Sequence, residues 1–338
     1  GICMLVLKDG YKSTLSMRDT QRAIKLTRDT FQNNLCAALN LERISAPLFV
    51  TKSSGLNDDL NGFERAVSFD VKDMAGEGEA VIVHSLAKWK RTALKKYGFN
   101  AGEGLYTDMN AIRRDEEMDN LHSIYVDQWD WERVIERKDR NEEYLKETVQ
   151  KIIAALCDTL DTVKERFPSV DVNIEKNVHF VTTQELEDMY PDFTAKEREK
   201  AIAKEYGTVF IMKIGEKLKS GKPHDGRAPD YDDWQLNGDI IIYNEVLEDA
   251  FEISSMGIRV DEKSLDYQLK ASGKDERRSF DYHKQILEGT LPLTIGGGIG
   301  QSRVCMLLLG KLHVGEVQAS LWPKEMIKIC AENGVNLL

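Results

Sequence analysis

The chain carries Gly296-Gly297-Gly298-Ile299-Gly300-Gln301-Ser302-Arg303 near its end, followed at once by the apolar run Val304–Leu309. Glycines allow a backbone to pass close to a flat ligand. The N-terminus of a helix favours negative charge, and an arginine in the first helical turn can reach a phosphate with its planar guanidinium. The stretch therefore predicts a glycine loop that leads into a helix and takes part in ATP chemistry.

The glycine run differs from the two commonest nucleotide-binding motifs. A dinucleotide fingerprint, G-x-G-x-x-G, needs a third glycine at the position of Arg303. A P-loop needs Gly-Lys followed by Ser or Thr, whereas the Gly-Lys pairs of this chain precede Pro223, Asp275 and Leu312. Taken alone, such a run is more typical of a tight structural turn, so the ATP hypothesis depends on the residues that accompany it.

Composition and net charge argue against several classes of protein. The chain has 338 residues, of which 41% are hydrophobic, and a net charge of −11, which opposes nonspecific binding to nucleic acid or anionic membranes. No apolar run is long enough to span a membrane, and residues 1–7 lack the features of a signal peptide. The five cysteines are scattered and form no CxxC pair, which indicates reduced thiols. We therefore expect a cytoplasmic protein that acts on small molecules.

Hydrophobic periodicity and turn signals predict alternating helices and strands. Helices are predicted at residues 16–40, 141–167, from 182 to before Pro191, from 194 to 207, and in two short segments within 262–288. Strands are predicted at 43–50, 79–84, 121–126, 178–181, 208–214, 239–243 and 247–253, with an acidic loop at 221–238. We expect one α+β domain at 16–338 with a mostly antiparallel sheet flanked by helices, preceded by an extension or remnant at 1–15.

Polar residues gather in a few stretches. Lys90 lies near a predicted strand-to-helix junction, where it either points into a cleft or belongs to a solvated basic helix start. Residues 127–132 interleave two tryptophans with carboxylates, which predicts a strand with one face in the core and one in a polar cleft. The acids at 230–239 are either solvated or hold Mg²⁺ or a substrate ammonium. On the strand around Glu252, Phe251 and Ile253 share one face and Glu252 takes the other.

No Ser-His-Asp set is apparent, and none of the six histidines has metal-ligand helical spacing. These absences favour group transfer by positioning and electrostatics rather than by a protein nucleophile.

Six stretches together resemble the type A, ammonia-dependent asparagine synthetases (aspartate–ammonia ligases), over a similarity that runs from about residue 20 to the C-terminus. The stretches are His84–Arg91, Ala101–Thr107, Val126–Glu132, Arg227–Trp234, Leu247–Val260 and Thr294–Arg303. That family is similar to the catalytic core of class II aminoacyl-tRNA synthetases. The resemblance implies a homodimer, with Arg43–Pro47 as the first class II motif, Arg113–Glu116 as the second and Gly298–Arg303 as the third.

The resemblance also implies a reaction. The β-carboxylate of aspartate attacks the α-phosphorus of ATP to give β-aspartyl-AMP and pyrophosphate, and ammonia then displaces AMP. Aspartate is expected to lie reversed relative to a synthetase substrate, with its α-carboxylate on Arg259 and Lys90. No glutaminase domain is visible, so ammonia is the expected nitrogen source.

Site residues carry over by motif. Lys90, Arg113 and Arg303 are expected to be catalytic. The aspartate shell is expected to comprise Asp58, Ser85, Lys90, Arg113, Gln128, Asp232, Ser254 and Arg259. The ATP shell is expected to comprise Ser123, Val126, Arg227, Asp239, Glu252, Gly298, Gly300 and Arg303, with Asp239 and Glu252 as the Mg²⁺ ligands. Two departures from the family, a shorter loop between Trp234 and Asn237 and Asp59 in place of a frequent asparagine, concern how the active-site lid closes.

Two alternatives stay open at this point. One is a synthetase-like protein that binds an amino acid or associates with tRNA without ligase activity. The other is an aspartate-activating enzyme that uses a different amine acceptor.

Overall fold

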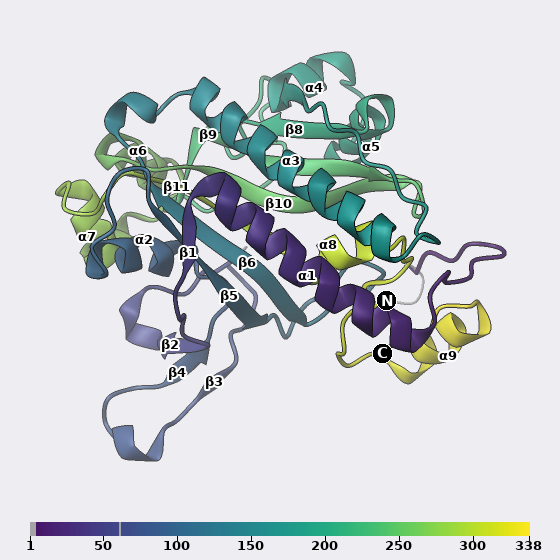
Figure 1. The fold of residues 1–338 in the computed structure, drawn as a ribbon. Helices are drawn as coiled ribbons and strands as arrows, with labels where there is room; N and C mark the ends of the chain where they lie inside the picture. Colours follow the sequence, from purple (N-terminus) through teal and green to yellow (C-terminus); the bar gives the residue numbers. More distant parts are fainter. Residues whose placement is uncertain (1–4, 61) are drawn as a thin grey trace.

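The computed structural model describes residues 5–60 and 62–338, and its centre is an eight-stranded sheet (Figure 1). The strands of this sheet are β1 (Leu41–Arg43), β5 (Gly104–Ile112), β6 (Tyr125–Val134), β7 (His179–Thr182), β8 (Thr208–Met212), β9 (Asp232–Asn244), β10 (Asp249–Arg259) and β11 (Thr294–Gly300). Their spatial order is β1-β5-β6-β11-β10-β9-β8-β7. Only β1–β5 and β7–β8 pair in parallel, so the predicted mostly antiparallel α+β fold is confirmed.

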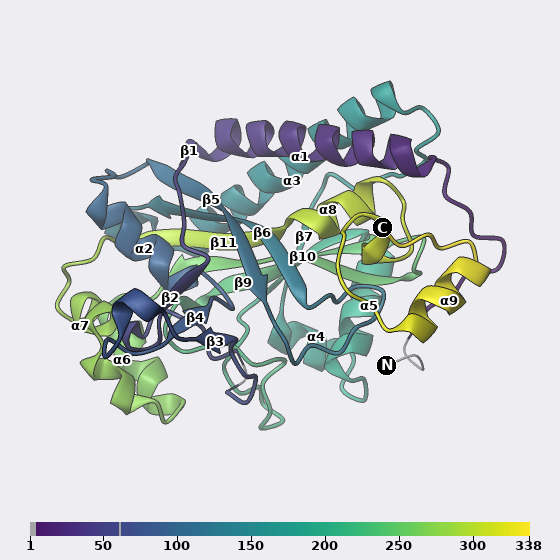
Figure 2. The same cartoon turned by 90° about the horizontal axis from the view of Figure 1, so that it is seen from below.

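Two long helices cover one face of this sheet. Helix α1 (Met17–Leu39) and helix α3 (Glu142–Arg166) lie side by side across it (Figures 1 and 2). Phe31 of α1 is fully buried and packs against Trp129 of β6, with ring centroids 4.9 Å apart. Both helices start at a capping side chain that accepts a backbone N–H, Ser16 for α1 and Asn141 for α3. The periodic apolar stripes predicted from the sequence therefore form the main core.

Strand alternation builds a second, smaller core on the opposite face near β8. Phe210 and Met212 face the main core, whereas Val209 and Ile211 pack under two short helices. The remaining helices are α2 (Ala87–Lys96), α4 (Thr183–Met189), α5 (Ala195–Tyr206), α6 (Glu262–Ala271), α7 (Asp281–Leu287), α8 (Gln301–Leu308) and α9 (Lys324–Glu332). Single 3₁₀ turns lie at Lys52–Ser54 (η2), Lys72–Met74 (η3), Arg137–Asp139 (η4), Asp275–Ser279 (η5) and Val314–Glu316 (η6).

A three-stranded sheet, β2-β4-β3, lies apart from the large one (Figure 1). Its strands are β2 (Phe49–Thr51), β3 (Ser68–Phe69) and β4 (Ala80–Ile82). The predicted strand at 43–50 is wrong as one element, because its first residue ends β1 and its last two belong to β2. Pro47 lies in the break, where it lacks the N–H that a strand in a sheet would donate.

The glycine stretch is a strand and not a loop, which corrects the prediction. Residues 294–300 form β11 between β6 and β10, and none of the glycines within it has a positive φ. A Cβ on Gly296 would lie 1.8 Å from Glu132 Oε1, and one on Gly298 would lie 2.3 Å from Gln128 Oε1. The glycines are needed because side chains of β6 lie across this strand.

Two other predicted boundaries were wrong. Strand β6 begins at Tyr125, because Asp119 Oδ1 accepts the backbone N–H groups of Leu121 and His122 and holds a turn there. Residues 232–238, predicted as loop, are the start of β9 and pair with β10. The strands predicted at 239–243 and 247–253 lie within β9 and β10 and pair with each other as a hairpin, since Asn244 pairs with Asp249.

Residues 1–4, which include Cys3 and the start of the predicted extension, lie outside the described part of the chain. The other four cysteines carry free thiols. In residues 5–60 and 62–338, no helix combines the length and the apolar character that crossing a membrane requires.

Candidate active site

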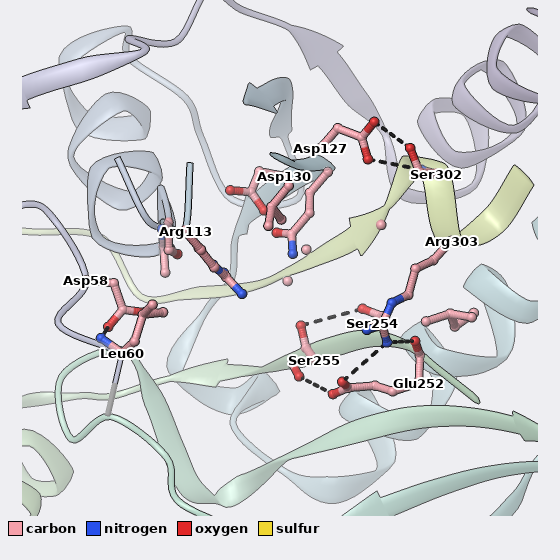
Figure 3. Close-up of a pocket in the computed structure, with 18 of the residues that line it drawn as sticks. Asp58, Leu60, Arg113, Asp127, Asp130, Glu252, Ser254, Ser255, Ser302 and Arg303 are labelled. Atoms are coloured by element: carbon pink, nitrogen blue, oxygen red, sulfur yellow. Dashed lines mark hydrogen bonds and ion pairs between the residues drawn. The ribbon is translucent and has the colours of Figure 1, made fainter. Parts of the chain in front are cut away.

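A cavity of about 360 Å³ opens on the face of the large sheet opposite α1 and α3 (Figure 3). Strands β6, β10 and β11 form its floor, and the segment around Asp58 and the turn between β5 and β6 form part of its wall. Every site residue predicted from the sequence lines this cavity except Asp239. The predicted residues that line it are Asp58, Ser85, Lys90, Arg113, Ser123, Val126, Gln128, Arg227, Asp232, Glu252, Ser254, Arg259, Gly298, Gly300 and Arg303.

The alternation predicted for residues 127–132 is confirmed. Trp129 and Trp131 are fully buried in the core, while Gln128 and Asp130 face the cavity. Asp130 is 2% exposed, and its Oδ2 atom has no hydrogen-bond partner among the residues that the structure describes. Burial raises the pKa of Asp130, although nearby Lys90 and Arg259 oppose the effect. An unsatisfied carboxylate oxygen therefore borders the cavity.

Lys90 reaches the cavity floor from α2. Its Nζ donates to the carbonyls of Trp131 and Gly297 at 3.0 Å and lies 3.6 Å from Asp130 Oδ1 and Glu132 Oε1. Burial lowers the pKa of Lys90 despite these two carboxylates. The lysine is thus fixed between β6 and β11 and not solvated at a helix start.

Arg259 is held by two buried carboxylates. Its Nε and Nη2 donate to Glu132 at 3.1 and 3.0 Å, and its Nη1 donates to Asp232. Burial alone would raise the pKa of Glu132, but Arg259 and Lys90 lower it below its usual value. A guanidinium has five N–H groups, so these contacts leave one free on each terminal nitrogen.

Asp239 lies just behind the cavity surface. Ser255 Oγ is 2.8 Å from both Asp239 Oδ1 and Glu252 Oε1, and Arg227 Nη1 is 3.0 Å from Asp239 Oδ1. Glu252 and Ser255 share a face only because a β-bulge follows Glu252. Burial and the neighbouring Glu252 raise the pKa of Asp239 well above its usual range. Two acidic side chains are therefore held close together around Ser255, with one arginine paired to Asp239.

Two arginines extend into the same space from opposite sides (Figure 3). Arg113 Nη2 donates to the carbonyl of His84 at 3.1 Å. Arg303, in the first turn of α8, donates to the carbonyl of Glu252 at 2.8 Å and contacts His122 Nε2 at 3.2 Å. Both guanidiniums are thus positioned mainly by neutral acceptors.

The segment that carries Asp58 is tied to the rest of the fold. Asp58 Oδ1 accepts the N–H of Leu60 at 2.9 Å, and Tyr231 donates to Asp58 Oδ2 at 3.3 Å. The adjacent Asp59 pairs with Arg277, which also donates to the fully buried Asp230 at 2.9 Å. Asp59, singled out in the sequence as a departure, therefore anchors the segment.

Sequence reasoning missed several residues that shape the cavity. Glu132 holds Arg259, and His122 contacts Arg303. Asp127 accepts from Ser302 Oγ at 2.6 Å and from Arg28 Nη2 at 3.0 Å, which fixes the start of α8. The alternation of residues 127–132 was the available signal for Glu132, but no local pattern pairs it with an arginine so distant in the sequence.

Comparison with known proteins identifies close relatives. The family model described as aspartate-ammonia ligase matches residues 18–334. The chain is 60% identical to the aspartate–ammonia ligase of Clostridium tetani, over 99% of this chain and 98% of that protein. It is 59% identical to the aspartate–ammonia ligase of Ligilactobacillus salivarius, over 99% of both chains.

Solved structures show the fold. The asparaginyl-tRNA synthetase of Pyrococcus horikoshii complexed with asparaginyl-adenylate is similar with a TM-score of 0.65 and 15% identity, over 90% of this chain and 70% of that one. The Entamoeba histolytica asparaginyl-tRNA synthetase gives a TM-score of 0.64 and 13% identity, over 89% of this chain and 66% of that one. The predicted class II synthetase-like fold is confirmed. Since the family model spans nearly the whole chain and the relatives share over half of its residues, the chain belongs to the aspartate-ammonia ligase family.

Proposed function

We propose that this protein makes L-asparagine from L-aspartate and ammonia, with ATP converted to AMP and pyrophosphate. In a chain of this family, the proposal rests on one observation: Lys90, Arg113, Arg259, Arg303 and several carboxylates line the same cavity. ATP and aspartate together bring both negative and positive groups, so a site for both must offer donors and acceptors in one enclosed space.

In the first step, the β-carboxylate of aspartate attacks the α-phosphorus and pyrophosphate leaves, which gives β-aspartyl-AMP. Two anions must approach each other, so the charge that develops at phosphorus has to be neutralised. Arg113 and Arg303 suit this role because they enter the cavity from opposite sides and donate hydrogen bonds mainly to carbonyl oxygens rather than to carboxylates. Gly298 and Gly300 line the same cavity beside Arg303, and the nucleotide is proposed to lie along this edge of it.

Aspartate is proposed to bind with its α-carboxylate on Arg259 and Lys90. The two N–H groups left on the terminal nitrogens of Arg259 suit a bidentate contact with a carboxylate. Lys90 has a third N–H beyond the two that it gives to carbonyls. Glu132 and Asp232 then act as positioning residues, since they hold Arg259 in place.

Asp239 and Glu252 fit a Mg²⁺ ion bound together with ATP. Among the described residues, no three acidic, histidine or cysteine side chains gather into a complete metal site. Mg²⁺, however, is usually held by one or two carboxylates plus substrate phosphates. The close pair of acidic side chains around Ser255 has the oxygen donors that this requires. A bound Mg²⁺ would supply charge neutralisation at the phosphates.

In the second step, ammonia attacks the β-carbonyl carbon and AMP leaves. Ammonium must lose a proton before it can act as a nucleophile. Among residues 5–60 and 62–338, the cavity carboxylates for which no arginine partner is found within ion-pair distance are Asp58, Glu116 and Asp130. Of these three, Asp58 and Asp130 are the buried ones. We assign them to the two ammonium groups of the reaction, that of aspartate and the incoming one.

The direct test is incubation of the purified protein with aspartate, ATP, Mg²⁺ and ammonium, with AMP and asparagine measured together. Equal amounts of AMP and asparagine are expected. AMP without asparagine would favour another amine acceptor, and no product would favour the binding-protein alternative. Replacing ammonium by glutamine should lower the rate strongly.

We further propose that the enzyme is a cytoplasmic homodimer that uses residues 43–47 at its interface. This segment begins at the last residue of β1, the edge strand of the large sheet, and its neighbours Leu48 and Phe49 are 46% and 49% exposed. Sedimentation velocity should give twice the mass of the 38.4 kDa chain. A monomer at micromolar concentration would overturn this assignment without affecting the proposed reaction.

A further inference from the structure

A second cavity, also of about 360 Å³, lies away from the proposed active site. It is enclosed by the segment that precedes α1, by the first turn of α1, and by residues that follow α8 up to the end of the chain. Its polar side chains are those of Lys12, Ser13, Thr14, Ser16, Thr20, Lys311, Glu316 and Asn336. Nothing in the proposed reaction uses this space.

Lys311 is a buried cation with neutral partners. Lys311 is 3% exposed, and its Nζ donates hydrogen bonds to Ser13 Oγ and to Thr20 Oγ1. No carboxylate forms an ion pair with Lys311 within the described segments. An ammonium has three N–H groups, so one is left over, and burial of an unpaired charge is costly.

Glu316, which lines this cavity, and the nearby Asp19 already have hydrogen-bond or ion-pair partners. The negative charge of Glu316 acts on Lys311 and opposes the lowering of its pKa by burial. Glu316 accepts hydrogen bonds from Tyr11 Oη at 2.9 Å, from Leu312 N at 2.9 Å and from His313 N at 3.0 Å. Asp19, in the first turn of α1, pairs with Arg22 at 2.8 Å. The cavity therefore keeps an excess of donors.

The start of α1 adds further donors. Ser16 caps this 23-residue helix and its hydroxyl accepts from Asp19 N, which leaves the N–H groups of Met17 and Arg18 without an acceptor within the helix. The helix dipole favours negative charge at the same place. Lys12 is exposed at the rim of the cavity.

We propose that this cavity binds a small oxyanion, either a phosphate or a carboxylate. The anion would contact Lys311, Lys12 and the first turn of α1. Two parts of the chain that enclose this cavity, helix α1 and the segment after α8, also extend to the proposed active site. Gln318, a few residues after Lys311, donates to Ser302 Oγ at 3.1 Å and lines the active-site cavity, and Arg28 of α1 donates to Gln301 at 2.6 Å.

The test is isothermal titration of the full chain with sodium phosphate and, separately, sodium acetate, at constant ionic strength. An Arg303→Ala variant serves as the background, because it weakens anion binding at the active site. One oxyanion per chain is expected to bind in this background. Binding of phosphate alone or acetate alone identifies the class of ligand, and binding of neither overturns the proposal.

Two substitutions locate the ligand. Lys12→Ala should weaken binding about fivefold, the equivalent of ~1 kcal/mol, without lowering the melting temperature of the free protein, because the side chain is exposed. Lys311→Met should abolish binding, and Lys8→Ala is the matched control, since Lys8 is an exposed lysine of the same segment outside the cavity lining. If Lys311→Met does not fold, a comparison of the anion affinities of Lys12→Ala and Lys8→Ala still tests the proposal. Equal affinities in these two variants would sink the proposal.

Discussion

Replacing Arg259 by lysine tests how aspartate is oriented. Lysine keeps the positive charge but loses the planar fork of donors. In the structure, Arg259 gives two N–H groups to Glu132 and one to Asp232, and its two remaining N–H groups are those assigned to the α-carboxylate of aspartate. A lysine ammonium cannot serve both buried carboxylates and the substrate in that geometry.

The size of the effect follows from the bonds lost. A charge-assisted hydrogen bond contributes about 1.5–3 kcal/mol. Loss of one such bond to the substrate, at ~2 kcal/mol, corresponds to roughly a 30-fold higher KM for aspartate. The KM for ATP should change little, since Arg113 and Arg303 are untouched. The variant should also lose about 3 kcal/mol of folding free energy, because Glu132 becomes incompletely paired.

Steady-state kinetics with varied aspartate, and saturating ATP, Mg²⁺ and ammonium, measure the first effect, and thermal denaturation measures the second. Arg91→Lys is the matched control. Arg91 is 1% exposed and donates to the carbonyls of Pro292 and Val260, but it does not line the cavity. Arg91→Lys should therefore lower stability alone. An unchanged aspartate KM in Arg259→Lys, or an equal rise in both variants, would refute the proposed orientation.

Three further substitutions test other parts of the site. Gly298→Ala places a methyl 2.3 Å from Gln128 Oε1, so it should lower both kcat/KM for aspartate and the melting temperature, at a packing cost of about 1–3 kcal/mol. Glu252→Gln should raise the Mg²⁺ concentration for half-maximal activity about tenfold or more, because Asp239 is then the one acidic side chain of the pair left to bind the ion. The aspartate KM should stay the same, and an unchanged Mg²⁺ requirement would remove Glu252 from the metal site. Burial would raise the pKa of Asp230, but a lysine, an arginine and a histidine around it lower that pKa below its usual range. The charge of Asp230 therefore adds stability above about pH 4, and this stability is lost as pH falls. Asp230→Asn should be about 3–5 kcal/mol less stable at pH 7, and urea unfolding at stepped pH should show that its stability depends less on pH in acid than that of the unmodified protein. The same pH dependence of stability in both proteins would contradict this.

The sequence predicted well those features that depend on local periodicity. The stripes of α1 and α3, and the alternation that sends Trp129 into the core and Asp130 into the cavity, both follow from the repeat of helix or strand. The class of chemistry also followed from residue types, because lysine, arginine and carboxylate clusters keep their character whatever the exact backbone.

The glycine run shows where such reasoning fails. Both a ligand and a neighbouring side chain can occupy the space that a missing Cβ leaves, and the sequence does not say which. Gln128 and Glu132 take much of that space in the structure, through a strand pairing that brings together residues more than 160 positions apart. The partnership of Arg259 with Glu132 is hidden for the same reason, since no local pattern encodes a long-range register.

Contacts made by the four arginines divide the cavity into two electrostatic regions. Arg227 and Arg259 are each paired with buried carboxylates at 3.0 Å or less, so their charges are largely neutralised within the protein. Arg113 and Arg303 rest mainly on carbonyl oxygens, and the carboxylate of Glu252 is as far as 4.0 Å from Arg303. A triphosphate needs positive charges that are not already paired with carboxylates of the protein. A zwitterionic amino acid needs a site in which positive and negative groups nearly balance. We therefore propose that the unneutralised pair serves ATP and the neutralised pair serves aspartate, which would bring the β-carboxylate and the α-phosphorus together where the two regions meet. This proposal differs from the family resemblance, which places Arg227 in the ATP shell and Arg113 in the aspartate shell.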